Sequence, residues 1–482
     1  MKQSLWNSEE FCKVINGKSN SKTFWDAFSI SLDSRKVKKG GVFFAINGIN
    51  NDGHDYIIKA FQNGAIASVV NANSKCIFND HNFIEVDNTF KALEKLAINR
   101  RKSLNIKLIA ITGSVGKTST KDFLSSILNK KFKCYANEGN YNNKFGVPLS
   151  LSQIPKKTDY VIQEMGMSLP KEIKLLSNLS EPNLSIITSI GGSHLGNFKN
   201  IKDIAYAKSE IFGGMKKNGI AILPGDSIYL NILKSEAKNA GLSNIFLFGY
   251  NDKNDCKILS SKIRYNINEV TVMLKGQKIN FRINSHQKHD AINSAAAVLA
   301  SNLLGLSAIE IQKIIPELRT SEKRGSISYL NHSSGSKITI VDDAYNASYE
   351  STVSAISSLR NLSLSSPVLI LGDMLELGQF STDEHKKLIP IIEEVKPRLF
   401  IGVGRQMSII GKSLKSNYET LCFKNSNDAK NTVPKLIKNN DLVLVKGSNG
   451  MHLSKITQAI NLHFKTFEKN YLPSSKVNSY AI

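Results

Sequence analysis

The sequence predicts an α/β protein of three domains: a small N-terminal α/β domain, a central domain built on a parallel sheet, and a C-terminal Rossmann-like open α/β domain. The first observation is the length of 482 residues, which corresponds to about three domains of ordinary size. The second is that apolar runs of strand length alternate with amphipathic helical segments from Lys107 onwards, as in βαβ units. The third is that this alternation breaks near residue 256 and begins again after about residue 325.

The N-terminal domain is predicted over residues 1–103. Short apolar runs such as 42–46 are separated there by turn-rich stretches such as 47–53. We assign residues 104–325 to the central domain and 326–466 to the C-terminal domain. The tail over 467–482 is expected to be poorly ordered.

The central domain is predicted from strands that are each followed by a helix. The strands cover 108–111, 160–162, 184–187 and 219–223, and the helices cover 117–131, 169–179, 201–217 and about 227–240. Alternating, strand-like segments over 256–284 predict a β-meander, and an Ala-rich helix follows near 288–304. In the C-terminal domain the predicted strands cover 337–342, 367–372, 398–403 and 441–446.

Composition limits the classes of function. No run approaches the length of a membrane-spanning helix, so we expect no stable membrane insertion, and the N-terminal residues do not have the pattern of a secretory signal. Five widely spaced cysteines offer no metal pair or disulfide framework, which favours a cytoplasmic location. The net charge of +23 would suit a polyanionic partner. Because the lysines are dispersed and no nucleic-acid-binding motif is present, we expect small polyanions such as nucleotides and not nucleic acid.

A phosphate-binding loop is the most informative segment. A buried strand over 109–112 leads into a glycine-containing turn and then into a helix that starts at Lys117. Backbone N–H groups of such a turn converge on one point, which an anion satisfies. Lys117 can reach the β- and γ-phosphates, and the hydroxyl of Thr118 can bind Mg²⁺. The strict motif has a further glycine where this chain has Ile111, so the strand–loop–helix context carries the prediction. The proposed nucleotide-binding residues are Gly113, Ser114, Val115, Gly116, Lys117, Thr118 and Ser119.

Three polar side chains follow other predicted strands of the same domain. Glu164 ends the strand near 160–162, His194 lies beyond the strand 184–187, and Lys208 lies on the next helix between small and apolar residues. Each residue also has an ordinary alternative role. Glu164 could be a helix cap or a surface acid, His194 a structural histidine, and Lys208 a solvated lysine. Because ligands of such sheets bind at the carboxyl ends of the strands, Thr118, Glu164 and His194 are predicted as Mg²⁺ and phosphate ligands. Two metal ions would neutralise a transferring phosphate.

The order of these motifs resembles the Mur ligase family from about residue 32 to residue 453. The similarity is carried by Asp33-Ser34-Arg35, the loop 113–119, Gly139-Asn140-Tyr141-Asn142-Asn143, Glu164-Met165-Gly166, His194-Leu195-Gly196, Ala207-Lys208-Ser209-Glu210, Asp342-Asp343-Ala344-Tyr345-Asn346-Ala347, Gly372-Asp373-Met374-Leu375-Glu376-Leu377-Gly378 and Val445-Lys446-Gly447-Ser448. Within the family, the stretches that begin at Gly139, Asp342 and Gly372 look like the branch that adds D-alanyl-D-alanine.

The resemblance implies an ATP-dependent peptide ligase of cytoplasmic peptidoglycan synthesis. In the family, ATP phosphorylates the C-terminal carboxylate of a UDP-N-acetylmuramoyl-tripeptide. The amine of D-alanyl-D-alanine then attacks the acyl phosphate, and the products are the amide and phosphate. The implied roles of the three domains are binding of the UDP substrate, binding of ATP, and ligation. We expect a monomer, with these three substrates as its partners.

The resemblance also implies roles for single residues. It matches Thr118 and Glu164 to a first Mg²⁺ site, and His194 and Lys208 to a second, with Lys208 carbamylated by CO₂. The implied catalytic residues are Lys117, Glu164, His194 and Lys208. The remaining matches concern ATP (Asn293, Arg324 and Asp343), the UDP part (Ser34 and Arg35), and phosphate or the incoming dipeptide (Asn140, Asn142 and Asn143). An Asn-rich turn is the alternative for the last group. The chain departs from the family pattern at Asp290, Ser348 and Asn449.

Other functions would also use this loop. A folylpolyglutamate synthase shares the loop and the lysine, but the N-terminal domain argues against it. A nucleic-acid-stimulated ATPase would suit the charge of +23, and a scaffold without catalysis would not need Lys117.

Overall fold

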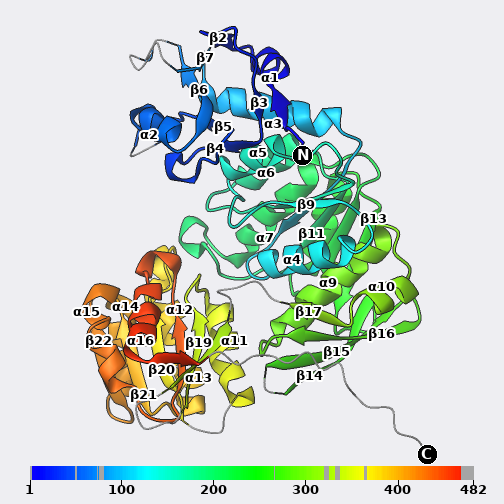
Figure 1. Ribbon diagram of the computed structural model, residues 1–482. Helices are drawn as coiled ribbons and strands as arrows, with labels where there is room; N and C mark the ends of the chain where they lie inside the picture. Colours follow the sequence, from blue (N-terminus) through cyan, green and yellow to red (C-terminus); the bar gives the residue numbers. More distant parts are fainter. Residues whose placement is uncertain are drawn as a thin grey trace, which may run out of the picture.

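Three large sheets follow one another along the chain in the computed structural model, which describes residues 3–48, 51–72, 74, 81–264, 266–319, 325–331, 337–362 and 366–467. The N-terminal part lies against the central part, and the C-terminal part lies beside the central part (Figure 1). This arrangement confirms the predicted mixed α/β class with parallel sheets. The predicted tail lies outside the described residues, except for Phe467, which ends a strand. None of the described helices combines the length and apolar character needed to cross a membrane.

The N-terminal part contains a five-stranded sheet of order β2-β7-β6-β5-β4, in which β2 is antiparallel to β7 and the other pairs are parallel. Its core gathers Trp6, Phe11 and Phe44 beneath helix α3. The elements are β1 (Trp6–Asn7), α1 (Ser8–Ile15), β2 (Lys18–Ser19), β3 (Asp26–Ala27), β4 (Ser29–Ser31), β5 (Gly41–Phe44), α2 (Ile57–Gln62), β6 (Ala65–Asn71), β7 (Phe83–Val86) and α3 (Thr89–Ser103).

The central sheet has the order β17-β16-β15-β14-β13-β12-β11-β8-β10-β9, and the strands from β9 to β13 are all parallel. Its strands are β8 (Lys107–Thr112), β9 (Cys134–Ala136), β10 (Tyr160–Glu164), β11 (Leu184–Ile187), β12 (Ile220–Pro224), β13 (Asn244–Gly249), β14 (Cys256–Arg264), β15 (Ile267–Leu274), β16 (Gln277–Asn284) and β17 (Glu317–Arg319). Its helices are α4 (Lys117–Leu128), α5 (Gly146–Ser152), α6 (Glu172–Ser180), α7 (Ile201–Ser209), α8 (Leu230–Asn239), α9 (His289–Leu303) and α10 (Ala308–Ile314).

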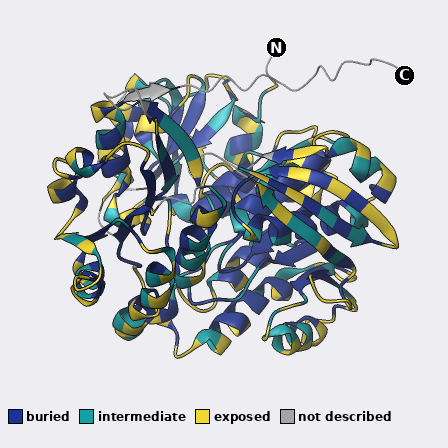
Figure 2. Ribbon diagram, turned by 90° about the horizontal axis from the view of Figure 1, so that it is seen from below, coloured by how far each residue is buried: buried dark blue, intermediate teal, exposed yellow. Residues whose placement is uncertain are grey.

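The structure refines the prediction for this part. The antiparallel meander β14-β15-β16 is present, but it continues the parallel sheet through β13. The helix predicted over 201–217 ends at Ser209 and passes into a 3-10 turn over Glu210–Gly214. Two adjacent glycines close that turn, and glycine is a poor helix former. Burial is concentrated in the strands, and exposed residues lie mainly on outer helix faces and loops (Figure 2).

The C-terminal sheet has the order β22-β21-β20-β23-β19-β18-β24, with five parallel strands followed by two antiparallel ones. Its strands are β18 (Ser326–Asn331), β19 (Lys337–Asp343), β20 (Val368–Gly372), β21 (Leu399–Val403), β22 (Glu419–Phe423), β23 (Leu442–Lys446) and β24 (Lys465–Phe467). Its helices are α11 (Tyr349–Ser358), α12 (Ser381–Lys386), α13 (Ile389–Val395), α14 (Arg405–Leu414), α15 (Ser426–Ala429) and α16 (Ser454–His463).

Strand register places the candidate residues at one edge of the central sheet. Glu164 of β10 lies opposite Ile111 of β8, and Ile187 of β11 lies opposite Thr112. The three strands therefore end together, just before the phosphate loop, Met165 and the segment that leads to His194. This is the carboxyl edge at which parallel sheets bind ligands.

Candidate active site

Two glycines give the phosphate loop its shape. Gly113 has φ +151° and Gly116 has φ +89°, in the region that disfavours other residues. A Cβ on Gly113 would lie 1.9 Å from Oγ1 of Thr188, and one on Gly116 would lie 2.2 Å from Oδ1 of Asn293. Both positions therefore require glycine for conformation and for space, and helix α4 begins directly after them.

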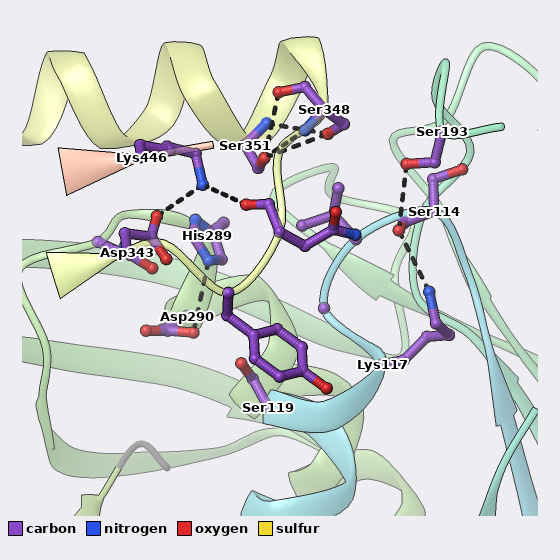
Figure 3. Close-up of a pocket in the computed structure, with 15 residues that line it drawn as sticks. Ser114, Lys117, Ser119, Ser193, His289, Asp290, Asp343, Ser348, Ser351 and Lys446 are labelled. Carbon is purple, nitrogen blue, oxygen red and sulfur yellow. Dashed lines mark hydrogen bonds and ion pairs between the residues drawn. The ribbon is translucent and has the colours of Figure 1, made fainter. Parts of the chain in front are cut away.

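The segment after β11 forms hydrogen bonds with the phosphate loop. Oγ of Ser114 donates to the carbonyl of Gly191 at 3.0 Å and accepts the N–H of Gly191 at 2.9 Å. Oγ of Ser189 accepts the N–H of Val115 at 2.9 Å. Nζ of Lys117 donates to the carbonyl of Gly113 at 2.7 Å and to that of Ser114 at 3.3 Å, and the second contact is drawn in Figure 3. The lysine thus lies folded over the loop, within reach of any phosphate bound there.

Thr118 and Glu164 meet as the sequence predicts. Oγ1 of Thr118 donates to Oε2 of Glu164 at 2.7 Å, and Nδ2 of Asn142 donates to Oε1 at 2.7 Å. Glu164 is buried, and its backbone N–H donates to Oδ1 of Asn137 at 2.8 Å. Sequence reasoning missed Asn137, because an asparagine before a turn carries no signal of contact with a strand end.

The Asn-rich segment divides into two kinds of residue. Asn140, Asn142 and Asn143 all line the same cavity, and Asn142 holds Glu164. Oδ1 of Asn143 also accepts the N–H of Phe145 at 3.1 Å and of Gly146 at 2.9 Å. The hydrogen bonds of Asn143 are therefore those of a turn residue, as the alternative interpretation expects. Asn142 instead contacts Glu164 within the site.

Lys208 is fully enclosed. It is 1% exposed, and its side chain makes no hydrogen bond or ion pair with any residue that the structure describes. Burial, and after it the nearby ammonium of Lys117, lower the pKa of Lys208 well below its usual value. The interpretation as a solvated lysine is therefore wrong. Burial therefore disfavours the charged form of the Lys208 side chain beside the phosphate loop.

His194 faces the C-terminal domain. It has φ +64°, which is unusual for a residue other than glycine. Its Nδ1 contacts Oε2 of Glu376, a residue that also has φ +64°. The hydrogen bond from His194 lowers the pKa of the Glu376 carboxyl. No role was predicted for Glu376, although it lies in one of the motifs that carry the resemblance.

A small cavity of about 90 Å³ lies between the phosphate loop and the C-terminal domain (Figure 3). Nζ of Lys446, at the end of β23, donates to Oδ2 of Asp343 at 2.8 Å and to the carbonyl of Asn346 at 3.0 Å. Asp343, a predicted nucleotide contact, lines this cavity together with the phosphate loop. Lys446 was not predicted as a site residue. Its position at the end of a buried strand was the available signal.

Helix α9 closes the floor of this cavity. Nδ2 of Asn293 donates to Oδ1 of Asp290 at 3.3 Å, and Oδ2 of Asp290 accepts from Oγ of Ser285 at 2.6 Å. The atypical Asp290 is buried, and its Oδ1 also lies 3.8 Å from Nε2 of His289 (Figure 3). Arg324 lies outside the described residues.

The two predicted N-terminal contacts lie on a short turn over Ser34–Lys36. Ser34 is buried, and its carbonyl accepts from Nδ2 of Asn63 at 2.8 Å. The guanidinium of Arg35 is exposed and forms a bidentate pair with Asp33. Nζ of Lys36 lies 5.9 Å from the ring centre of Tyr141, so this turn borders the Asn-rich segment.

A larger cavity of about 500 Å³ joins these elements. It extends from Lys117 and Glu164, past the Asn-rich segment, to His194 and to Glu376 and Asn449 of the C-terminal domain. Groups that suit phosphate and groups from the opposite domain therefore face one shared space.

The chain belongs to the Mur ligase family, the class of enzyme that this fold and cavity define. Residues 28–101 match the Mur ligase family catalytic domain, 111–301 the Mur ligase middle domain, and 330–449 the Mur ligase glutamate ligase domain. Among relatives, it is 32% identical over 94% of its length to the UDP-N-acetylmuramoyl-tripeptide–D-alanyl-D-alanine ligase of Rickettsia prowazekii, of which it covers 99%.

Solved structures show the same likeness. A MurF crystal structure from Acinetobacter baumannii superposes with a TM-score of 0.81 at 25% identity, over 94% of this chain and 98% of the other. The MurF ligase of Thermotoga maritima in complex with ADP has a TM-score of 0.72 at 24% identity, over 90% and 97% of the two chains, and supports the fold.

Proposed function

We propose that this chain joins D-alanyl-D-alanine to a UDP-N-acetylmuramoyl-tripeptide with cleavage of ATP to ADP and phosphate. The observation that carries the proposal is the cavity of about 500 Å³, in which the phosphate loop faces residues of the opposite domain. The ligase name of a relative that is matched over 94% of this chain supports the choice of substrates.

The reaction makes a poor acyl donor reactive. Transfer of the γ-phosphate to the carboxylate of the tripeptide gives an acyl phosphate, and attack by the amine expels phosphate and forms the amide. Lys117 would leave the carbonyls of Gly113 and Ser114 and donate to the transferring phosphate, which is a stronger acceptor. The N-terminus of α4 points at the same place, so its N–H groups stabilise the negative charge without rearrangement.

The residues fit Mg²⁺ at the edge of β8 and β10. The Thr118 hydroxyl and the Glu164 carboxylate provide two oxygen ligands, and Mg²⁺ ordinarily retains water and substrate phosphates as the others. Among the described residues, no three His, Cys, Asp or Glu side chains gather into a metal-binding group. When bound, the ion would neutralise phosphate charge. His194 could contribute Nε2 of its imidazole to a second ion, because only its Nδ1 contacts Glu376.

Carbamylation of Lys208 would supply the missing anionic ligand. A neutral amine adds to CO₂ to give a carbamate and a proton, and the burial of Lys208 favours the neutral form of its amine. Carbon-13 NMR after equilibration with labelled bicarbonate should show a carbamate signal in the wild type that is lost in Lys208→Met. No difference between the two proteins would refute the modification.

The nucleotide would extend from the loop into the cavity beside Lys446. Asp343 and Asn293 border that region, and Arg324 stays a prediction. Ser34 and Arg35 are proposed for the UDP part because their turn borders the Asn-rich segment. The free thiols of the described cysteines favour action in the cytoplasm, and we propose a monomer.

The decisive experiment measures ADP release and the mass of the product with a panel of UDP-muramyl peptides and amino acids or dipeptides. The proposal expects an amide product only when the tripeptide and D-alanyl-D-alanine are both present with ATP and Mg²⁺. Stimulation by DNA or RNA instead would identify a nucleic-acid-dependent ATPase. Glutamate addition to a folate would identify the sibling ligase, and a Lys117→Ala variant with full cellular function would identify a scaffold.

A further inference from the structure

Glu376 stands at the meeting point of two cavities that lie between the central and C-terminal domains. The cavity of about 500 Å³ and a neighbouring one of about 260 Å³ share His194, Asn346, Glu376 and Asn449 in their linings. The smaller cavity is otherwise lined by residues such as Ser448 and Gly450. A ligand that extends from the smaller cavity into the larger one would therefore lie beside Glu376.

The backbone around Glu376 is held by both domains. Its carbonyl accepts the N–H of Gly196 at 2.9 Å, and the preceding N–H, of Leu375, donates to Oγ of Ser448 at 2.9 Å. A Cβ on Gly196 would lie 2.5 Å from the N of Gly378, so the two segments touch through their backbones. These contacts maintain the left-handed conformation of Glu376, which costs free energy and is typically kept at functional sites.

The carboxylate of Glu376 is bound differently from the other carboxylates that line the larger cavity. The other two carboxylates in the larger cavity are held locally: Glu164 by Thr118 and Asn142, and Glu172 by the N–H groups of Ser168 and Leu169. Glu376 contacts His194 from the other domain. If His194 turns to another ligand, the carboxylate faces the cavity and can accept a hydrogen bond from another cation.

We infer that Glu376 binds the ammonium group of the incoming amine substrate and places it between the smaller cavity and the acyl phosphate. This inference rests on the proposed function, and it makes Glu376 a specificity-determining residue for the acceptor. In the structure without ligand, the imidazole of His194 occupies the position of that ammonium. A charged hydrogen bond of this kind favours a primary amine over a neutral acceptor of the same shape.

The test compares Glu376→Gln with the wild type in amide-forming assays. We expect the KM for D-alanyl-D-alanine to rise about 10- to 100-fold, as for loss of a hydrogen bond to a charged group, while the KM for ATP changes less than about twofold. A dipeptide whose amine is replaced by hydroxyl, used as a competitive inhibitor, should bind the wild type far more weakly than D-alanyl-D-alanine binds. In Glu376→Gln that discrimination should disappear.

Glu350→Gln is the matched control. Oε1 of Glu350 also crosses from the C-terminal domain, to the N–H of Gly192 at 2.9 Å, but Glu350 lines neither cavity. Equal increases of the dipeptide KM in both variants would assign the effect to domain contact and overturn the inference. An unchanged dipeptide KM in Glu376→Gln, or an equal rise of its KM for ATP, would also overturn it. Failure of the wild type to form the amide would instead overturn the proposed function.

Discussion

The central domain meets its two neighbours in different ways. Towards the N-terminal domain, helix α5 packs against α3, and Leu149 joins the apolar core around Trp6. Nε1 of Trp6 donates to the carbonyl of Ser152 at 2.8 Å, and the N–H of Ile30 donates to Oε1 of Gln153 at 2.9 Å. This interface is apolar and closely packed, so separation of the two domains would expose the core of the smaller one.

Towards the C-terminal domain, the contacts that border the site are polar. Glu350 accepts from Gly192, Glu376 contacts His194, and Nδ1 of His289 lies 3.0 Å from Oγ of Ser354. A core cluster also contains apolar residues of both domains, but cavities lie between the polar contacts. Polar interfaces of this kind permit relative movement of domains. The comparison suggests one fixed interface for holding substrate and one adjustable interface for assembling the reactive groups.

The largest effect on stability should come from the fixed interface. Trp6 is fully buried and lies under the guanidinium of Arg100. Trp6→Ala should lower the free energy of unfolding by about 3–5 kcal/mol, because it leaves a cavity and an unpaired carbonyl. Urea unfolding followed by circular dichroism would measure this loss, and Phe24→Ala, at an exposed residue, is the control. Similar stability of the two variants would contradict the comparison.

The loop variant should separate chemistry from stability. Lys117→Ala should reduce kcat by about 10²–10³-fold, the usual cost of removing one preorganised group that stabilises charge in the transition state. Its unfolding curve should stay close to that of the wild type, because the two hydrogen bonds from Nζ of Lys117 go to carbonyls of its own loop. Steady-state ADP release and urea unfolding on the same preparation test both halves. A variant that unfolds early would place Lys117 in the framework instead.

Ligands should move only the adjustable interface. Small-angle scattering with ATP analogue, UDP-tripeptide and Mg²⁺ should show a smaller radius of gyration than the free protein. Distance measurements between spin labels should assign the change to the central and C-terminal domains, with a constant distance between the central and N-terminal domains. Movement of both pairs, or of neither, would refute the distinction between the interfaces.

The smallest effect is expected at the start of α11. Ser348 is the N-cap of this helix, and its Oγ accepts the N–H of Ser351 in a capping box. Ser348→Ala should lower stability by about 1 kcal/mol. Thermal unfolding would detect it, and a modest rise of the KM for ATP should accompany it because Ser348 lines the cavity near the loop. A loss as large as that of Trp6→Ala would mean that the C-terminal interface is equally rigid.

Some of the site follows from local sequence. The apolar strand, the two glycines and Lys117 predict the phosphate loop, since loop conformation depends on neighbouring residues. The pairing of Thr118 with Glu164 also follows, because parallel strands end at one edge. The helix predicted over 201–217 was too long, as periodicity does not register the short 3-10 turn at its end.

By itself the sequence determined the fold class, the family and the strand ends that face phosphate, because these depend on short-range spacing and on motifs in a fixed order. Only the tertiary structure decided that Lys208 is buried near Lys117, that Lys446 pairs with Asp343, and that Glu376 reaches His194 from another domain. Those contacts join residues from about 90 to 180 positions apart. The first two depend on which strands and helices become neighbours within one domain, and the third depends on how the central and C-terminal domains pack together.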